Sequence, residues 1–341
     1  MDSQERVLRF AQRFVECFGG VTEREGQALK VLLPSQLAQS LELPEETAFG
    51  EGQMPLPLGS PVLDRMIHAA TASPPVVFGQ ISTEYLKKAG FAQILLRDFS
   101  FPNSRVSLGQ TADTRTTYLL LYAHYTALSD ERKEGQVQVA VQEKTGAVVE
   151  GFEDNWIWFP CTFFDPDNVP AHFPKDISSA VQAGLIRAKA LALQDLADFI
   201  ESMHRRLRRD VRHTREYYQA LEKEMTAGLN HPTLGEAQKA ERLTKIRALP
   251  DEAARKIEDL QRKYEIRLTV RPSGAIRLLV GVVQAMVTVQ HRQWQRMVSL
   301  FWNPVTRAFD PLVCESCGAS MHTVYCRAED GRIALCCRDC G

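Results

Sequence analysis

The stretch CESCGASMHTVYCRAEDGRIALCCRDC, residues 314–340, holds two C-x2-C pairs with 19 residues between them. Two residues between paired cysteines allow a tight turn to direct both sulfurs at one ion, and the small Gly318 follows the first pair, where the backbone must bend. The spacing lies in the range of four-cysteine zinc ribbons. It predicts one structural zinc ion held by four ligands, which leave no coordination position open: Cys314, Cys317, Cys337 and Cys340.

The same stretch predicts the scaffold of the metal site. Residues 322–327 and 332–335 have strand character, and the turn at residues 329–331 joins them into the expected ribbon hairpin. Cys326 is expected to be a small buried strand residue, and Cys336 is an alternative ligand without the pair spacing. A disulfide framework and an iron–sulfur cluster are the other uses of such cysteines. A disulfide framework is disfavoured because a chain without a secretory signal is expected in a reducing compartment. An iron–sulfur cluster is disfavoured because the paired spacing suits a tetrahedral zinc ion better.

Upstream of the ribbon, residues 178 to about 227 are predicted to form one long helix. Apolar residues recur there mostly in steps of three and four, as in a coiled-coil seam: Leu193, Leu196, Ile200, Met203, Leu207, Val211, Tyr218, Leu221 and Met225. At 1.5 Å per residue, such a helix would be roughly 75 Å long, so it must protrude or pair.

The helix is expected to turn back on itself. Helix breakers in residues 228–232 precede a capping-box pattern at Thr233 and Glu236. A return arm, kinked or restarted at Pro250, would complete an antiparallel helical hairpin over residues 178–265. The alternative is an ordinary helical subdomain folded onto the core.

The outgoing arm carries a run of arginines that offers a second candidate site: Arg205, Arg206, Arg208, Arg209, Arg212 and Arg215. Four of these, at positions 205, 208, 212 and 215, share a helix face and are expected to follow a phosphate backbone. The alternative is a solvated flank paired with acidic residues. Arg208 and His213 also have the R-x4-H spacing of one class of helical ribonucleases, which so arginine-rich a run meets by chance.

The rest of the chain predicts an α+β fold. A first helix carries Val7, Phe10, Phe14 and Phe18 on one side, residues 28–33 are β-prone, and a short helix from Ser35 and another over residues 59–72 follow. Strands are predicted, by apolar and β-branched runs, over residues 91–101, 116–126, 136–142, 156–164, 266–271, 275–290 and 295–302, with Pro272-Ser273-Gly274 as a turn.

The helices are therefore expected to be inserted within one β-rich body. The predicted divisions are an N-terminal α/β segment, a first part of the body, the helical hairpin, a second part of the body and the ribbon, at residues 1–74, 75–177, 178–265, 266–305 and 306–341.

Composition sets limits on localisation. The chain is 44% hydrophobic and 24% charged, and no stretch approaches the ~20 apolar residues of a membrane span. The start, MDSQERVLRFAQRF, is charged throughout, unlike a secretory signal, so a cytoplasmic protein without membrane contact is expected. Residues 1–175 hold 15 Lys and Arg against 22 acidic residues, and the residues after them hold 26 against 20, so the basic character lies in the C-terminal half.

No catalytic motif is present. The sequence has no G-x4-G-K-[ST] loop, no G-x-S-x-G elbow and no H-E-x-x-H, and its eight histidines are scattered, so an enzyme is not expected. One aromatic segment is expected to be core rather than a base-stacking surface: Trp156, Trp158, Phe159, Phe163 and Phe164.

Several stretches together resemble a known family. They are PLGSPVLD at residues 57–64, the strands and inserted helices after it, and Trp302-Asn303-Pro304 running through Phe309-Asp310-Pro311 into the first cysteine pair. This layout is similar to the region that follows the motor in bacterial RapA/HepA-like Swi2/Snf2 helicases, and the likeness covers most residues after about 57. The chain lacks the ATPase motor, so the resemblance implies no helicase activity. It implies an accessory piece that works with such an ATPase on DNA, in a bacterial genome-defence (antiviral) locus.

Three functions of different classes follow. The first is a non-catalytic zinc-ribbon and coiled-coil subunit that docks on a partner such as a Swi2/Snf2-like ATPase. The second is an autonomous DNA- or RNA-binding protein that uses the arginine face and the ribbon. The third is a nuclease. The sequence identifies neither the partner nor the oligomeric state.

Overall fold

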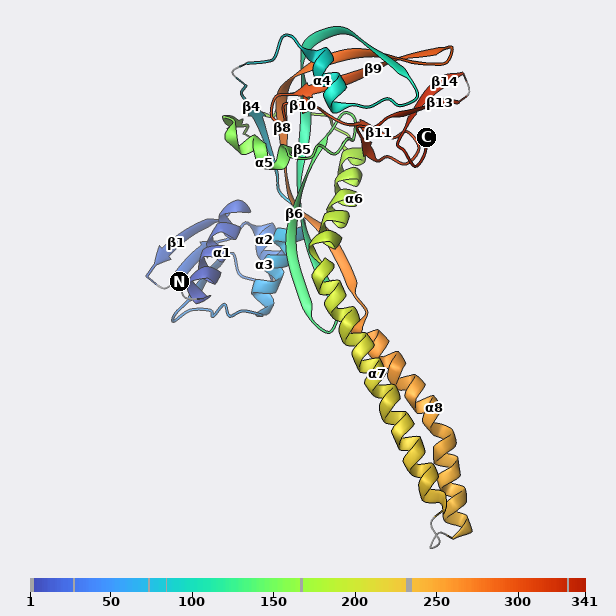
Figure 1. Cartoon of the computed structure of the whole chain (residues 1–341). Helices are drawn as coiled ribbons and strands as arrows, with labels where there is room; N and C mark the ends of the chain where they lie inside the picture. Colours follow the sequence, from blue (N-terminus) through green and yellow to red (C-terminus); the bar gives the residue numbers. More distant parts are fainter. Residues whose placement is uncertain are drawn as a thin grey trace. The chain divides into compact units, whose positions relative to one another are not determined.

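The computed structural model of the chain describes residues 3–26, 28–72, 74–83, 85–165, 168–230, 235–329 and 331–341. It is a mixed α+β protein that divides into two compact units, Met1–Pro75 and Val76–Gly341 (Figure 1). No helix within these described ranges is both long and apolar enough to cross a membrane.

The first unit packs helices against a small antiparallel sheet of strand order β1-β2-β3. Its elements are α1 (Ser3–Cys17), β1 (Val21–Glu25), β2 (Ala28–Leu32), α2 (Ser35–Leu41), β3 (Glu46–Gly50) and α3 (Pro61–Ala72). Leu29 and Val31 alternate inward on β2 and share a core with Phe14 and Val15 of α1. The sequence predicts α1, β2, α2 and α3, but it does not predict β1 and β3, which carry few apolar side chains.

The second unit is built on a seven-stranded sheet. Its strands are β4 (Val76–Ile81), β5 (Arg105–Leu128), β6 (Arg132–Gln142), β7 (Cys161–Phe163), β8 (Arg267–His291), β9 (Trp294–Asn303) and β10 (Ala308–Phe309). β8 is central in the sheet. Along one side it pairs with β5 in antiparallel fashion. Along its other side it pairs first with β4, in parallel, and then with β9, in antiparallel fashion. Strands from before and after the long helices therefore belong to one β-rich body.

One predicted strand is a helix. The apolar run over residues 91–101 suggests a strand, but α4 (Phe91–Asp98) occupies it. The buried residues Phe91, Leu95 and Phe99 recur every four positions, which is helical spacing. Gly90, with a φ of 82°, directly precedes the helix. The strand prediction was therefore wrong because it weighed hydrophobicity above periodicity.

The aromatic segment is largely not a strand. Residues 152–158 form α5 (Phe152–Asn155) and the 3-10 helix η1 (Trp156–Trp158), and only β7 remains extended. Trp158 is 79% exposed and Phe163 is 52% exposed, so the prediction of a buried aromatic core is wrong for these two side chains. β7 pairs over three residues with β4 at the end of the sheet path, which leaves little structure to cover it.

A predicted turn is a bulge within a strand. Pro272-Ser273-Gly274 lies inside β8, where the register with β5 shifts between Tyr122 and Ala123. Pro272 stands opposite Ala123 and Gly274 opposite Tyr122, so Ser273 is the extra residue. A bulge absorbs the proline without ending the strand.

The predicted first helix consists of two. α6 (Ser178–Asp195) ends at Leu196, and α7 (Ala197–Ala227) continues after this single residue. α6 lies on the sheet through a stripe of small buried residues spaced four apart: Ala180, Gly184, Ala188 and Ala192. A Cβ on Gly184 would lie 3.0 Å from Leu121 Cδ2, so the small stripe permits the close approach of helix and sheet.

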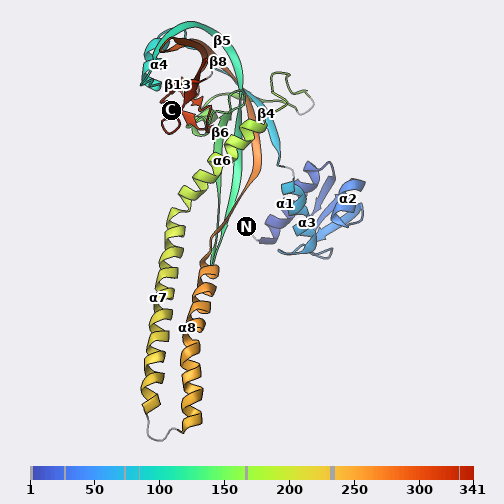
Figure 2. The same ribbon diagram turned by 90° about the vertical axis from the view of Figure 1, so that its right-hand side faces the viewer.

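α7 and α8 run side by side in opposite directions in both views (Figures 1 and 2). The 3-10 helix η3 (Gly228–Asn230) ends the outgoing arm, and α8 (Glu236–Tyr264) returns. Phe199 and Met203 of α7 and Leu249 and Tyr264 of α8 are buried. The sequence predicts a kink or a restart at Pro250, and because α8 continues through this residue, the restart does not occur.

The predicted capping box of Thr233 and Glu236 is not tested at Thr233, which lies outside the described residues, but Glu236 is the first residue of α8 and follows the N-cap Gly235. The backbone N–H of Gly235 donates to Gln238 Oε1 at 3.4 Å, which satisfies one donor at the helix start.

Two small antiparallel pairs complete the C-terminal ribbon. They are β11 (Leu312–Val313) with β12 (Ser320–Met321), and β13 (Tyr325–Glu329) with β14 (Arg332–Cys336). The second pair is the hairpin that the sequence predicts.

Candidate metal centre and arginine face

Each cysteine pair lies in a tight turn. The first turn joins β11 to β12, and the amide of Gly318 donates to the Cys314 carbonyl at 2.8 Å. Gly318 has a φ of 76°, a left-handed conformation that costs glycine little. The second turn follows β14, where the amide of Cys340 donates to the Cys337 carbonyl at 3.2 Å.

The two turns bring the four predicted ligands together. The sulfur atoms of Cys314, Cys317, Cys337 and Cys340 all lie within 4.8 Å of one another, and those of Cys317 and Cys337 are 3.7 Å apart. A tetrahedron with Zn–S bonds of ~2.3 Å has sulfur–sulfur edges of roughly 3.8 Å. The cluster therefore has the donors and the dimensions to hold a metal ion.

The electrostatics of the cluster are uneven. Burial opposes ionisation of the Cys314 thiol, but amide donors from Cys337, Cys317 and Ser316 lower its pKa to about 6. The Cys337 amide lies 3.3 Å from Cys314 Sγ. Neighbouring thiols, that of Cys337 foremost, raise the pKa of Cys340 to about 12. Four thiolates thus require a cation among them to coexist at neutral pH.

The other two C-terminal cysteines lie outside the cluster. Cys326 is buried in β13 with its sulfur 3.3 Å from Ser104 Oγ, which confirms the prediction of a buried strand residue. Cys336 is fully buried, and its sulfur is 3.5 Å from Ser316 Oγ.

The ribbon shares its core with the body. Val324, Ile333 and Leu335 belong to one buried cluster with Trp302 of β9 and Phe91 of α4.

Polar contacts fasten the ribbon at two further points. The Asn103 side chain both donates to the Cys326 carbonyl and accepts from its amide, at 2.9 Å each. Arg296 donates to the Ile333 carbonyl at 2.6 Å and pairs with Glu315. The body therefore stabilises the ribbon together with any bound metal.

The arginines of α7 fall into two groups. Arg206 pairs with Glu131 at 2.5 Å, and Arg209 pairs with the neighbouring Asp210 at 2.9 Å, so both are engaged within the protein.

The four arginines of the predicted face are exposed. Arg212 is 3.9 Å from Glu216, whereas Arg205, Arg208 and Arg215 form no ion pair with the described residues. Arg208 and His213 are five positions apart on one helix, a rotation of about 140°, so they do not converge as a nuclease pair.

A buried polar network was missed by sequence reasoning. Asp310 Oδ2 accepts hydrogen bonds from the Tyr118 hydroxyl at 2.6 Å and from Gln142 Nε2 at 2.7 Å, while Oδ1 accepts from Asn303 Nδ2 at 3.2 Å. Burial raises the pKa of Asp310 to about 7. The Asn-Pro and Asp-Pro dipeptides mark these positions in the sequence, but their partners lie some 160 to 190 residues away.

No protein-family model matches this chain, and a search of the curated proteins gave no match either.

Proposed function

We propose that the chain is a non-catalytic accessory subunit of a nucleic-acid-acting machine, with a Swi2/Snf2-like ATPase as its partner in bacterial genome defence. The four-cysteine centre holds zinc as a structural ion, since four thiolates leave no position for substrate. The α7–α8 pair acts as a coiled-coil arm that docks on the partner.

The proposal rests on contacts that fix the base of the α7–α8 arm to the body. Arg206 of α7 pairs with Glu131, and Lys263 of α8 pairs with Asp130 at 3.3 Å, so both helices are tied to the turn between β5 and β6. Tyr125 of β5 also donates a hydrogen bond to Asp195, at the end of α6. α7 alone extends about 46 Å at 1.5 Å per residue. A long arm fixed in direction at its base suits docking, because less conformational freedom is lost on binding.

The test combines purification from native cells with reconstitution. The tagged chain is expected to co-purify with an ATPase whose nucleic-acid-stimulated ATP hydrolysis changes when the chain is added. A shortened variant, in which a Gly/Ser linker replaces residues 214–249, should lose the ATPase but keep its metal. Retention of the ATPase by the shortened variant would overturn the docking role of the arm.

A second candidate is an autonomous DNA- or RNA-binding protein. It is favoured by Arg205, Arg208 and Arg215, which are exposed and form no ion pair within the part of the chain that the structure describes. If the arginine face contacts phosphates, replacing positions 205, 208, 212 and 215 with Gln should lower the slope of log affinity against log salt by up to about four. The helix should persist, because Gln is nearly as good a helix former.

A control variant loses four exposed cations elsewhere on the arm: Lys223, Arg247, Arg255 and Lys256. Its salt slope should stay near that of the parent. Equal slopes in the parent and the face variant would assign these arginines to a protein interface or to solvent.

A further inference from the structure

One edge of the body's sheet is open. The first residues of β8, Arg267–Arg271, pair with β5 on one side, and β4 covers the other side only from Ala275 onward. β4 begins at Val76, directly after Pro74 and Pro75, which have no amide hydrogen for a ladder. Among the described residues, no backbone partner other than β5 bonds to positions 267–271. Alternate residues of this edge therefore direct their backbone groups outward.

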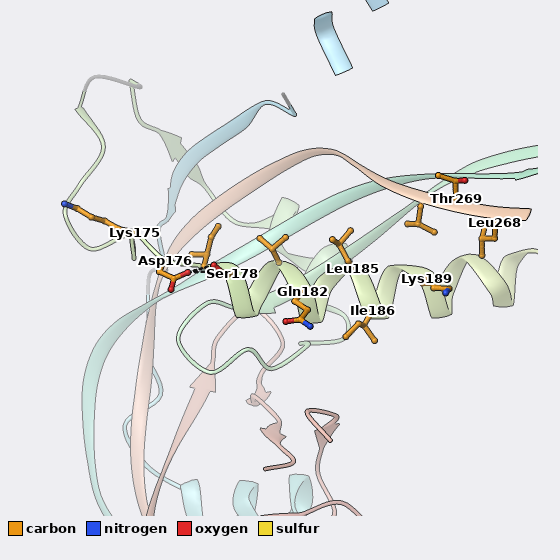
Figure 3. A pocket seen from close by; sticks show the side chains of 12 residues that line it. Lys175, Asp176, Ser178, Gln182, Leu185, Ile186, Lys189, Leu268 and Thr269 are labelled. Carbon is orange, nitrogen blue, oxygen red and sulfur yellow. Dashed lines mark hydrogen bonds between the residues drawn. The ribbon is translucent and has the colours of Figure 1, made fainter. Parts of the chain in front are cut away.

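An apolar groove of about 940 Å³ lies beside the open edge, between β8 and α6 (Figure 3). Val181, Leu185 and Ile186 line it from α6, and Leu268 and Val270 line it from β8. Ile186 is 66% exposed, which is unusual for an isoleucine beside a core. The groove therefore offers apolar contact next to unpaired strand backbone.

The charges around this site are mostly positive. Lys175 and Lys189 lie toward opposite ends of the groove (Figure 3), and both are exposed without an ion pair among the described residues. The Asp176 carboxylate already accepts from the amide and hydroxyl of Ser178, at 2.9 and 2.5 Å. Arg271 is exposed, and it too forms no ion pair with a described residue. An acidic occupant fits this setting.

Strand alternation defines the occupant further. Leu268 and Val270 face the α6–α7 side, where they pack in its hydrophobic clusters, so Arg267 and Arg271 face the other side of the sheet. Arg267 already pairs with Glu265 at 2.9 Å, so Arg271 is the main cation that an acidic occupant would meet there. A strand added to the edge would place alternate side chains in the groove and the intervening ones beside these arginines. Apolar residues suit the first set and acidic residues the second.

We infer that Arg267–Arg271 and the groove under α6 form a docking site for an extended protein segment that alternates apolar and acidic residues and joins the sheet as a further strand. This inference deepens the proposed accessory role, on which it rests for the identity of the partner, by naming the chemistry of the segment that docks.

The probe is a fluorescent octapeptide that alternates Glu with Val and Ile, with proline at both ends to limit self-association. Anisotropy should show that it binds the full chain, and that the same peptide with Lys in place of Glu does not. Two further versions of the Glu peptide are N-methylated, one on the odd-numbered backbone amides and the other on the even-numbered ones. Only one set faces the receptor in an added strand, so only one of these versions should lose binding. Equal behaviour of both N-methylated peptides, or of the Glu and Lys peptides, would overturn the inference.

Two variants locate the site on the chain. Reversing charge with Arg271→Glu should weaken peptide binding by about 10-fold or more, because Arg271 faces the acidic set, whereas Lys256→Glu on the arm should leave it unchanged. In the same way, Ile186→Asp should abolish binding and Leu193→Asp should not, because Leu193 is an exposed α6 residue outside the groove. Equal effects of the site and control variants would contradict the assignment.

Hydrogen exchange separates this inference from the proposed function. The peptide should protect amides within residues 267–271, whereas those at the outer edge of β6, residues 132–138, should exchange as before. Protection without any co-purifying ATPase would leave the docking site standing and refute the partner. An ATPase bound through the arm, with no protection at β8, would support the proposed partner and refute the docking site.

Discussion

The Tyr264 hydroxyl donates a 2.7 Å hydrogen bond to Asp210 Oδ2, which fastens the last residue of α8 to the middle of α7. Tyr264 is only 5% exposed, so its ring also fills the seam between the helices. The hydrogen bonds from Tyr264 and then Arg209 lower the pKa of Asp210. This contact sets the register of the two helices at the base of the arm.

The substitution Tyr264→Phe should lower the free energy of unfolding by about 1 kcal/mol, because it removes the hydrogen bond and keeps the ring. Chemical denaturation at neutral pH measures this. Because the pKa of Asp210 is lower in the folded state than in the unfolded state, its carboxylate stabilises the protein at pH values above the unfolded pKa. This stabilisation is lost as the pH falls through the folded pKa. The difference between parent and variant should therefore shrink in acid below pH ~4. Tyr217→Phe, at a 62% exposed position, is the control and should change nothing.

Elemental analysis of purified protein should find one zinc per chain. Cys337→Ser should release it, because three ligands remain and structural zinc contributes on the order of 10 kcal/mol to such folds. The arm packs in a hydrophobic cluster that contains no ribbon residue, so its helical circular dichroism should persist. Cys326→Ser should keep the metal, as should Cys17→Ser at an exposed position. Equal loss of metal from Cys326→Ser and Cys337→Ser would contradict the ligand assignment.

Asp310 should make the stability of the body depend on pH. Its folded pKa of about 7 lies above the ordinary value of 3.8, so its contribution is fully present below pH ~4 and is lost as pH rises toward 7. Unfolding measured between pH 4 and 7 should show this decline, at up to about 1.4 kcal/mol per pH unit. Asp310→Asn should be less stable at low pH and lack this part of the slope. An unchanged pH profile in the variant would show that other groups set it.

The close approach of α6 to the sheet should be sensitive at Gly184. Gly184→Leu places a side chain against Leu121 and should cost about 1–3 kcal/mol of unfolding free energy despite the better helix propensity of leucine. Gln194→Leu, at an exposed position of the same helix, should cost less than about 0.5 kcal/mol. Thermal denaturation of both variants tests the comparison. Equal stability of the two would mean that the helix can shift away from the sheet.

Spacings between residues close together in the sequence predict much of the fold. The cysteine pairs predict which sulfurs gather, and the helices of the first unit follow from apolar periodicity. The stripe from Ala180 to Ala192 is also present in the sequence as small residues four apart, but a pattern of large apolar residues does not reveal a contact face made of small ones.

What depends on distant partners could not be predicted. The bulge at Ser273 and the full length of β8 depend on its pairing with β5, some 150 residues earlier. The buried Asp310 network and the open edge at Arg267 likewise arise only when distant strands meet. A single sequence reports local pattern, whereas register between remote strands is set by packing.

Only two residues separate α8 from β8, which runs for 25 residues to the part of the sheet that packs against the ribbon. A pull on the arm along this strand would load the β5–β8 ladder in shear, so that many hydrogen bonds resist together rather than one after another. The same pull would reach the cysteine turns through β9 and the shared core. Mechanical work done on the arm would thus meet a stiff strut, whose far end packs against the ribbon that carries the four-cysteine cluster.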